Sequence, residues 1–325
     1  MLDEEMPHPP RALGAWARCG EGMSGMSVRR QFGIVVAACT VFAVPVLVAG
    51  CGGARVVAAT WAAPGASGSA PAPSATASAA GTGASRPSGA ASSPAGTVSG
   101  PLSLGPVTGK VIVIDPGHNG GNVTQPKLMA SPVPMGTGTK ACDTTGTETN
   151  AGYQEAAFTW DVSVRLAALL RSAGAKVIMT RNSNTGVGPC VDKRAAIGND
   201  NHAAVAISIH GDGAPAKDHG FHVLEPARVG APSNAIISQS HQLALKIRDN
   251  YRARTGIPPA NYIGTDGIDT RADMGGLNLS VVPKVLVECG NMRNAGDAAM
   301  MTSPTYRERM AEGFAAGLAA YLAAA

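Results

Sequence analysis

Short apolar runs alternate with longer amphipathic segments through the last two-thirds of the chain, and this alternation constrains the fold more than any other feature. Runs rich in β-branched residues predict buried strands at 110–115, 175–181, 204–210, 220–226 and 284–290. The spacing of apolar residues predicts helices at 155–174, 190–200, 233–255 and 304–322. Strands that alternate with helices indicate an α/β fold, with a mostly parallel twisted sheet and helices on both faces. Residues 106–325 suffice for one such domain, and we expect a single one.

The first 51 residues have a different character. Arg29 and Arg30 precede a mostly apolar run at 32–50 that ends "LVAGC", which is the layout of a signal peptide. "VAGC" resembles a bacterial lipobox, and this resemblance implies that Cys51 becomes the lipidated first residue of the mature protein. An ordinary signal peptide and a single membrane-spanning anchor are the alternatives, although a proline and several small residues in the run argue against spanning.

Residues 52–105 are mostly Ala, Ser, Gly, Pro and Thr, with almost no charge and almost no large apolar residue after Trp61. Such a segment buries too little apolar surface to offset the entropy of ordering, so we predict a disordered tether. A lipid anchor followed by a tether would place residues 106–325 outside the cytoplasm, at the outer face of the cell membrane. The net charge of +4 is small and not clustered, which gives no support for a nucleic-acid partner.

Polar side chains follow the predicted strands at their carboxyl ends, where ligands bind in open α/β sheets. "VIVID" leads to His118, "VAISI" ends in His210 and "KVLV" ends in Glu288, while Glu155 opens the first long helix. Two imidazoles and one carboxylate with an open fourth position form a common catalytic zinc set. Such a site makes water a nucleophile near neutral pH, and a further carboxylate must then carry its proton to the leaving group. His118, Glu155 and His210 can supply the first set, and Glu288 the last.

Each of these residues also has a simpler explanation. A histidine at a strand end is often an ordinary surface residue, and a glutamate such as Glu155 in the first turn of a helix is favoured by the helix dipole. Glu288 is the exception, because a carboxylate within the apolar run "VLVECG" is costly to bury without a purpose.

Four motifs in order, "IDPGHNG", "GYQEAAFTWDV", "SIHGDG" and "VLVECGNMRN", resemble the zinc-dependent N-acetylmuramoyl-L-alanine amidases of the amidase-3 family. The resemblance covers 108–324, and "CDTTGTETNAGYQEAAFTW" is similar to the compact actinobacterial branch. It implies an α/β catalytic domain with one zinc ion per chain, held by His118, Glu155 and His210, and a catalytic Glu288. The implied reaction is hydrolysis of the amide between N-acetylmuramic acid and L-alanine in peptidoglycan or muropeptides.

Three further residues are candidates for supporting this site. Arg194 and Asn199 lie in "CVDKRAAIGN", which is similar to a family segment, and two interpretations stay open: support of the site or substrate, or bracing of a helix. Asp115 precedes the first turn, where it would orient a ligand histidine or serve only as a turn residue.

The cysteines add one hypothesis about the long loop at 119–152. Cys142 and Cys190 lie in segments that flank the site loops, and in an oxidising exterior they would form a disulfide that ties this loop down. The loop is too long to be a mere connection, so we expect it to form one wall of the substrate groove. Cys289 is expected to behave as a small hydrophobic residue.

Two other functions compete with the amidase. An inactive, amidase-like peptidoglycan sensor would be favoured by loss of a ligand or of the glutamate, but all four residues are present. A zinc peptidase acting within the stem peptide is disfavoured because the sequence has no HExxH motif. We expect the protein to be a monomer.

Overall fold

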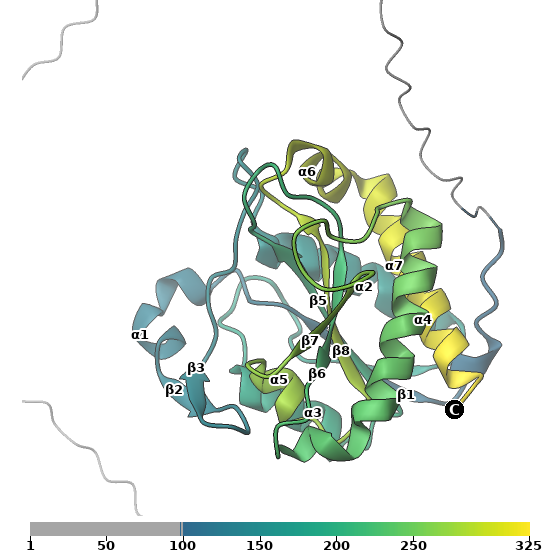
Figure 1. Cartoon of the computed structure of the whole chain (residues 1–325), viewed down its shortest axis with the longest axis horizontal. Coiled ribbons are helices and arrows are strands. Elements are labelled where there is room, and N and C mark those ends of the chain that lie inside the picture. Colours follow the sequence, from purple (N-terminus) through teal and green to yellow (C-terminus); the bar gives the residue numbers. More distant parts are fainter. Residues whose placement is uncertain (1–97, 99) are drawn as a thin grey trace, which may run out of the picture. The chain divides into compact units, whose positions relative to one another are not determined.

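The computed structural model describes residue 98 and residues 100–325 (Figure 1). The predicted signal region 1–51, with Cys51, and the predicted tether up to residue 97 lie outside the described residues. Within the described part, none of the helices combines the length and the apolar character needed to cross a membrane. The predicted domain boundaries therefore stay predictions.

A six-stranded sheet forms the centre of the domain, in the order β4-β1-β5-β8-β6-β7. Its strands are β1 (Val111–Pro116), β4 (Lys176–Met179), β5 (Val205–Asp212), β6 (His222–Pro226), β7 (Ile268–Arg271) and β8 (Lys284–Asn291). Strands β4, β1, β5 and β8 run parallel to one another, β6 is antiparallel to β8, and β7 is parallel to β6. The predicted α/β fold with a mostly parallel sheet is confirmed.

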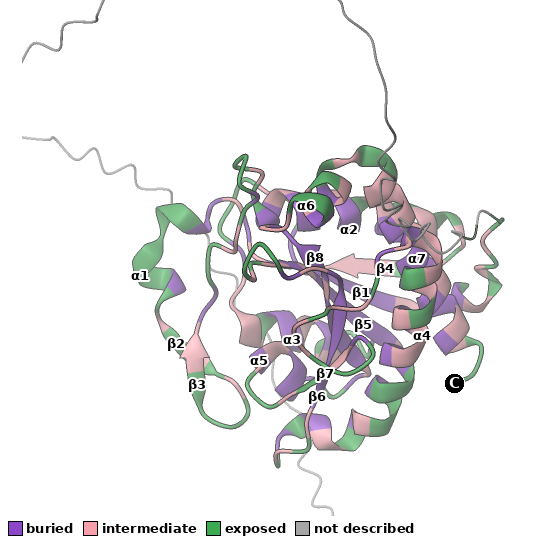
Figure 2. Ribbon diagram, turned by 45° about the horizontal axis from the view of Figure 1, so that its top comes forward, coloured by how far each residue is buried: buried purple, intermediate pink, exposed green. Residues whose placement is uncertain are grey.

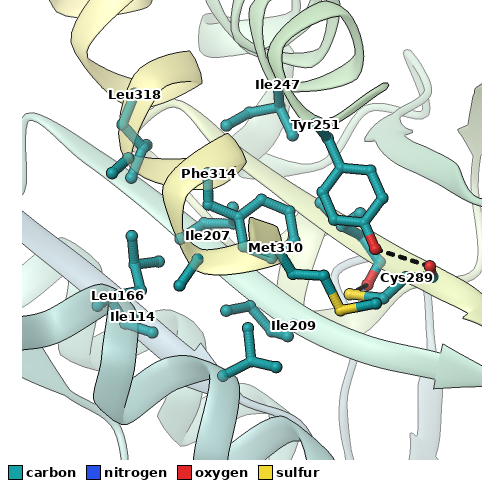
Figure 3. Close-up of a cluster of buried hydrophobic side chains, with 14 of the residues drawn as sticks. Ile114, Leu166, Ile207, Ile209, Ile247, Tyr251, Cys289, Met310, Phe314 and Leu318 are labelled. Carbon is teal, nitrogen blue, oxygen red and sulfur yellow. Dashed lines mark hydrogen bonds between the residues drawn. The ribbon is translucent and has the colours of Figure 1, made fainter. Parts of the chain in front are cut away.

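One face of the sheet is covered by three long helices, α2 (Glu155–Ser172), α4 (Ile237–Thr255) and α7 (Pro304–Leu322) (Figure 1). They bury the main hydrophobic core, in which Ile207 and Ile209 of β5 meet Phe314 of α7 (Figure 3). Tyr251 is fully buried and donates a hydrogen bond from its hydroxyl to the carbonyl of Cys289 at 2.7 Å. Cys289 is therefore a core residue with a free, buried thiol, as expected.

Among the described residues, the helices on the opposite face are two short ones, α3 (Val191–Asp200) and α5 (Gly275–Asn278). Figure 2 shows the buried strands between these helices and the longer α4 and α7. Two small apolar clusters pack on this face, one around Val113 and one around Leu286. The polar side chains of the sheet lie here, so this face holds the candidate site.

The remaining elements surround the carboxyl ends of the strands or cap the domain. They are the 3-10 helices Gly105–Val107, Asn122–Thr124 and Pro232–Ile236, and α1 (Pro126–Met129), β2 (Pro132–Pro134), β3 (Thr139–Ala141) and α6 (Ala295–Thr302). Strands β2 and β3 pair as an antiparallel hairpin within the 119–152 loop. The final helix begins and ends where the sequence predicted, whereas the hairpin, β7, α1, α5 and α6 were not predicted.

Candidate metal centre

Three elements bring the predicted ligands to one point. His118 lies two residues after β1, His210 lies near the end of the adjacent strand β5, and Glu155 is the first residue of α2. His118 has a φ of 55°, which places a non-glycine residue in the left-handed region. Such a conformation persists only where the surroundings hold it.

The donor atoms of these residues converge on the Glu155 carboxylate. Its Oε1 lies 3.2 Å from His118 Nε2 and 3.0 Å from His210 Nδ1. The two imidazole rings meet edge to face with their centroids 4.9 Å apart. One donor atom from each residue lies within 4.8 Å of the other two, a spacing that a single metal ion can bridge. The chemistry of the set, two imidazoles and a carboxylate, also suits a divalent ion such as zinc.

The turn after β1 is shaped by the second histidine. A Cβ on Gly117 would lie 2.3 Å from Cε1 of His210, so the imidazole of His210 packs directly on the backbone of the turn. The sequence "DPGH" therefore contributes its histidine to the site and makes room for the other one.

The electrostatics of the site favour positive charge at its centre. Although burial opposes it, Glu155 and Asp143 raise the pKa of His118 to about 10. Burial would raise the pKa of Glu155, but His118 and His210 lower it below its usual value. Glu155 also accepts hydrogen bonds from the backbone N–H groups of Thr147 at 2.9 Å and Gly211 at 3.1 Å. The carboxylate is thus fixed as an anion beside two imidazoles.

Glu288 lies on β8 directly opposite His210 of β5. Its Oε2 is buried and has no hydrogen-bond partner among the described residues. Burial, with the nearby carboxylates of Glu155 and Asp212, raises the pKa of Glu288 well above its usual value. A carboxyl group in this state is poised to exchange a proton.

A cavity of about 260 Å³ connects Glu288 with the two histidines. The sheet forms its floor, and its walls come from β3, α3 and α5, including Lys140, Val191 and Leu277. The predicted loop at 119–152 therefore lines the cavity through β3 and the residues that follow it.

The three predicted supporting residues have different places. Asp115 makes no contact with either ligand histidine among the described hydrogen bonds; it bonds Arg194 at 2.9 Å and Lys284 at 3.2 Å. Arg194 donates to the carbonyl of His118 at 3.0 Å, so it braces the site. Asn199 instead donates to the carbonyl of Leu279, away from the cavity.

Asp143, which sequence reasoning missed, contacts the His118 ring at the nitrogen that does not face Glu155. Its Oδ1 lies 3.0 Å from His118 Nδ1. The signal that could have identified Asp143 is its position directly after Cys142. Cys142 forms the predicted disulfide with Cys190 in the structure.

The family model for N-acetylmuramoyl-L-alanine amidases, Amidase_3, matches residues 112–320. The chain belongs to this amidase family. It is 44% identical over 219 residues to the N-acetylmuramoyl-L-alanine amidase Rv3717 of Mycobacterium tuberculosis, which covers 67% of this chain and 88% of that protein.

Two solved mycobacterial amidases have the same fold as this amidase. The Ami1 structure from Mycobacterium smegmatis matches with a TM-score of 0.64 at 43% identity, over 67% of this chain and 99% of that one. The apo form of Ami1 from Mycobacterium abscessus matches with a TM-score of 0.63 at 44% identity, over 66% and 100%. The amidase is thus an enzyme that hydrolyses the amide between N-acetylmuramic acid and L-alanine in peptidoglycan.

Proposed function

We propose that this amidase is a zinc enzyme in which His118, Glu155 and His210 hold one ion and Glu288 transfers the proton. The observation that carries the proposal is the convergence of the three donor atoms, within 4.8 Å of one another, on the cavity that Glu288 lines. Three protein ligands with an open fourth position are typical of catalytic zinc sites. The nitrogen-rich donor set favours zinc over magnesium or calcium, which prefer all-oxygen sites.

When bound, zinc supplies Lewis acidity, which makes water a nucleophile near neutral pH and polarises the substrate carbonyl. The protein supplies the remaining chemistry. The Glu288 carboxylate takes a proton from the attacking water and returns it to the nitrogen of L-alanine as the amide bond breaks. Its raised pKa suits this exchange, because the group must hold the proton long enough to deliver it.

The nature of the new amine tests this reaction. We expect the zinc-loaded full chain to convert a muramoyl-peptide into a peptide with a free N-terminal L-alanine, identified by mass spectrometry and end-group labelling. A different new terminus would indicate a peptidase, and binding without cleavage would indicate a sensor. Either result would contradict the proposal.

Substitution of the proton carrier tests the role of Glu288. We expect Glu288→Gln to lower kcat by about 10²- to 10⁴-fold, the usual contribution of a general acid-base group, while zinc stoichiometry stays at one. Glu308→Gln is the matched control, because Glu308 is a partly exposed glutamate of α7 that pairs with Arg165. Near-normal turnover in Glu288→Gln would remove this residue from the mechanism.

We also propose that the enzyme acts as a monomer outside the cytoplasm, held at the membrane by a lipid on Cys51. The signal-like N-terminus, the disulfide between Cys142 and Cys190 and the wall-polymer substrate support this location. We expect Cys51→Ser to move the chain from the membrane fraction to a soluble fraction. Continued membrane association would contradict lipidation, and light scattering of the soluble form measures the oligomeric state.

A further inference from the structure

The protonation of the His118 ring is fixed by its neighbours. Its Nδ1 lies 3.0 Å from Asp143 Oδ1 and 3.1 Å from the carbonyl oxygen of Thr144. A carbonyl oxygen can only accept a hydrogen bond, so Nδ1 carries the hydrogen. In the neutral ring, the lone pair is then on Nε2, the atom that faces Glu155.

Asp143 is itself held from several sides. Its Oδ2 accepts hydrogen bonds from Arg194 Nη2 at 3.1 Å and from Asn122 Nδ2 at 3.3 Å, and its Oδ1 also accepts from the backbone N–H of Thr144 at 2.7 Å. The residue is 7% exposed. These hydrogen bonds therefore fix the orientation of the Asp143 carboxylate toward His118 Nδ1.

The backbone that carries Asp143 has little regular structure of its own. Residues 142–147 belong to neither a helix nor a strand, and backbone hydrogen bonds from Cys142 to the Ser131 carbonyl and from Asp143 to the Met129 carbonyl hold the start of this segment. The disulfide joins Cys142, the residue before Asp143, to Cys190 at the N-terminus of α3. Arg194 lies one turn further along α3, and its backbone N–H donates to the carbonyl of Cys190. The disulfide, together with the hydrogen bond from the Val191 N–H to the Cys142 carbonyl, thus limits the distance between the two halves of the Asp143–Arg194 ion pair.

We propose that Asp143 is the positioning residue of the zinc ligand His118, and that the disulfide between Cys142 and Cys190 keeps its carboxylate in place. Outer partners of this kind set the tautomer and orientation of a ligand histidine and raise its basicity. The affinity for zinc then depends on Asp143 directly and on the disulfide through Asp143. This inference rests on the proposed zinc site.

The dissociation constant for Zn²⁺, measured by competition with a chelating dye, tests the first half. We expect Asp143→Ala to raise it by about 10- to 100-fold, the usual effect of losing an outer partner. Asp161→Ala is the matched control, because Asp161 of α2 also pairs with arginines, Arg165 and Arg307, but is remote from the cavity. Equal affinities in the two variants would overturn the assignment.

A spectroscopic measurement separates positioning from general damage to the fold. We expect the visible absorption of the Co²⁺-loaded protein to change in Asp143→Ala and not in Asp161→Ala, because only the first variant removes the hydrogen-bond partner of a ligand histidine. Asp143→Asn keeps an accepting oxygen without the charge, and we expect an intermediate affinity. It also serves if the alanine variant does not fold. Wild-type affinity in Asp143→Asn would show that the carboxylate is not needed.

A double-mutant cycle tests the second half. We expect Cys142→Ser/Cys190→Ser to weaken zinc binding in the wild-type background but to have little further effect on Asp143→Ala. Additive losses would overturn the link through Asp143. If the wild-type chain itself failed to bind zinc, the proposed function would fail; if it bound zinc and Asp143→Ala bound equally well, only this inference would fail.

Discussion

The two faces of the central sheet use the same strands for different purposes. In β5, Ile207 and Ile209 point into the core beneath α2, α4 and α7, whereas Ser208 and His210 point into the cavity. Because side chains alternate across a strand, one short segment serves both faces. In this fold, residues that stabilise the core and residues that line the candidate site therefore alternate along one strand, and they are not in separate domains.

The faces also differ in how their buried groups interact. The core face is apolar and close-packed, and its contribution to stability does not depend on ionisation. The cavity face buries Asp115, Arg194 and Lys284 as an ion-pair network. Such a network contributes only while its members keep their charges, so the two faces should respond differently to substitution and to pH.

The largest effect is expected on zinc binding from His210→Ala. Loss of a ligand should weaken zinc binding by more than the roughly 10- to 100-fold expected for an outer partner, and amidase activity should fall with it. The free energy of unfolding of the metal-free protein should also fall, because His210 is one of the two imidazoles beside the buried Glu155 carboxylate. Calorimetric titration with zinc and urea unfolding measure the two quantities. If His210→Ala bound zinc as tightly as the wild type, His210 would not be a ligand and the contrast between the two faces would fail.

The ion-pair network gives a prediction about stability and pH. Burial would raise the pKa of Asp115, but Lys284 and Arg194, with hydrogen bonds from Ser208 and Thr180, lower it well below its usual value. Asp115 therefore stabilises the fold above the pKa of about 3.9 that an unfolded aspartate has, and this contribution is lost as the pH falls through the folded-state pKa.

We expect Asp115→Asn to lower the free energy of unfolding by about 3–5 kcal/mol at pH 7, since it leaves two buried cations without their anion. The difference from the wild type should shrink as the pH is lowered below 4. Urea unfolding of the metal-free proteins at pH 7 and pH 3 measures it. A difference that does not change with pH would contradict the role given to this carboxylate.

The core face gives a prediction in which the loss of stability does not depend on pH. Ile209→Ala should lower the free energy of unfolding by about 2–5 kcal/mol through lost burial and a residual cavity. This loss should be the same at pH 7 and pH 3, and the dissociation constant for zinc should stay close to that of the wild type. Ile209 is adjacent to His210, so a strong loss of zinc binding would show that the two faces are not independent.

Much of the fold could be predicted because its main strands and helices have strong patterns. The helix that begins at Glu155 and the final helix from Pro304 have long apolar stripes and clear ends. Strand β7 could not be recognised, since "IDTR" has a single apolar residue and lies at the sheet edge. The antiparallel entry of β6 between β8 and β7 depends on packing that the sequence does not encode locally.

The candidate site also contains residues that the sequence could predict and one that it could not. His118, Glu155 and His210 lie at the ends of predictable elements, but each also had a simpler explanation, and the resemblance to the amidases was needed to single them out as one set. Asp143 lies in an irregular segment, 25 residues from its partner His118, where no periodic pattern operates. The sequence left open whether Asp115 orients a ligand histidine or is a turn residue, and its carboxylate instead pairs with Arg194 and Lys284 inside the sheet.

The close packing of the His210 ring on Gly117 has a consequence for how this enzyme can vary. The absence of one methyl group in the first turn sets where an imidazole 93 residues later in the chain can stand. Any larger residue at this position would push that ring off the site without replacing any ligand residue. Variation in the "DPGH" turn is thus restricted by its neighbour across the sheet as much as by its own histidine.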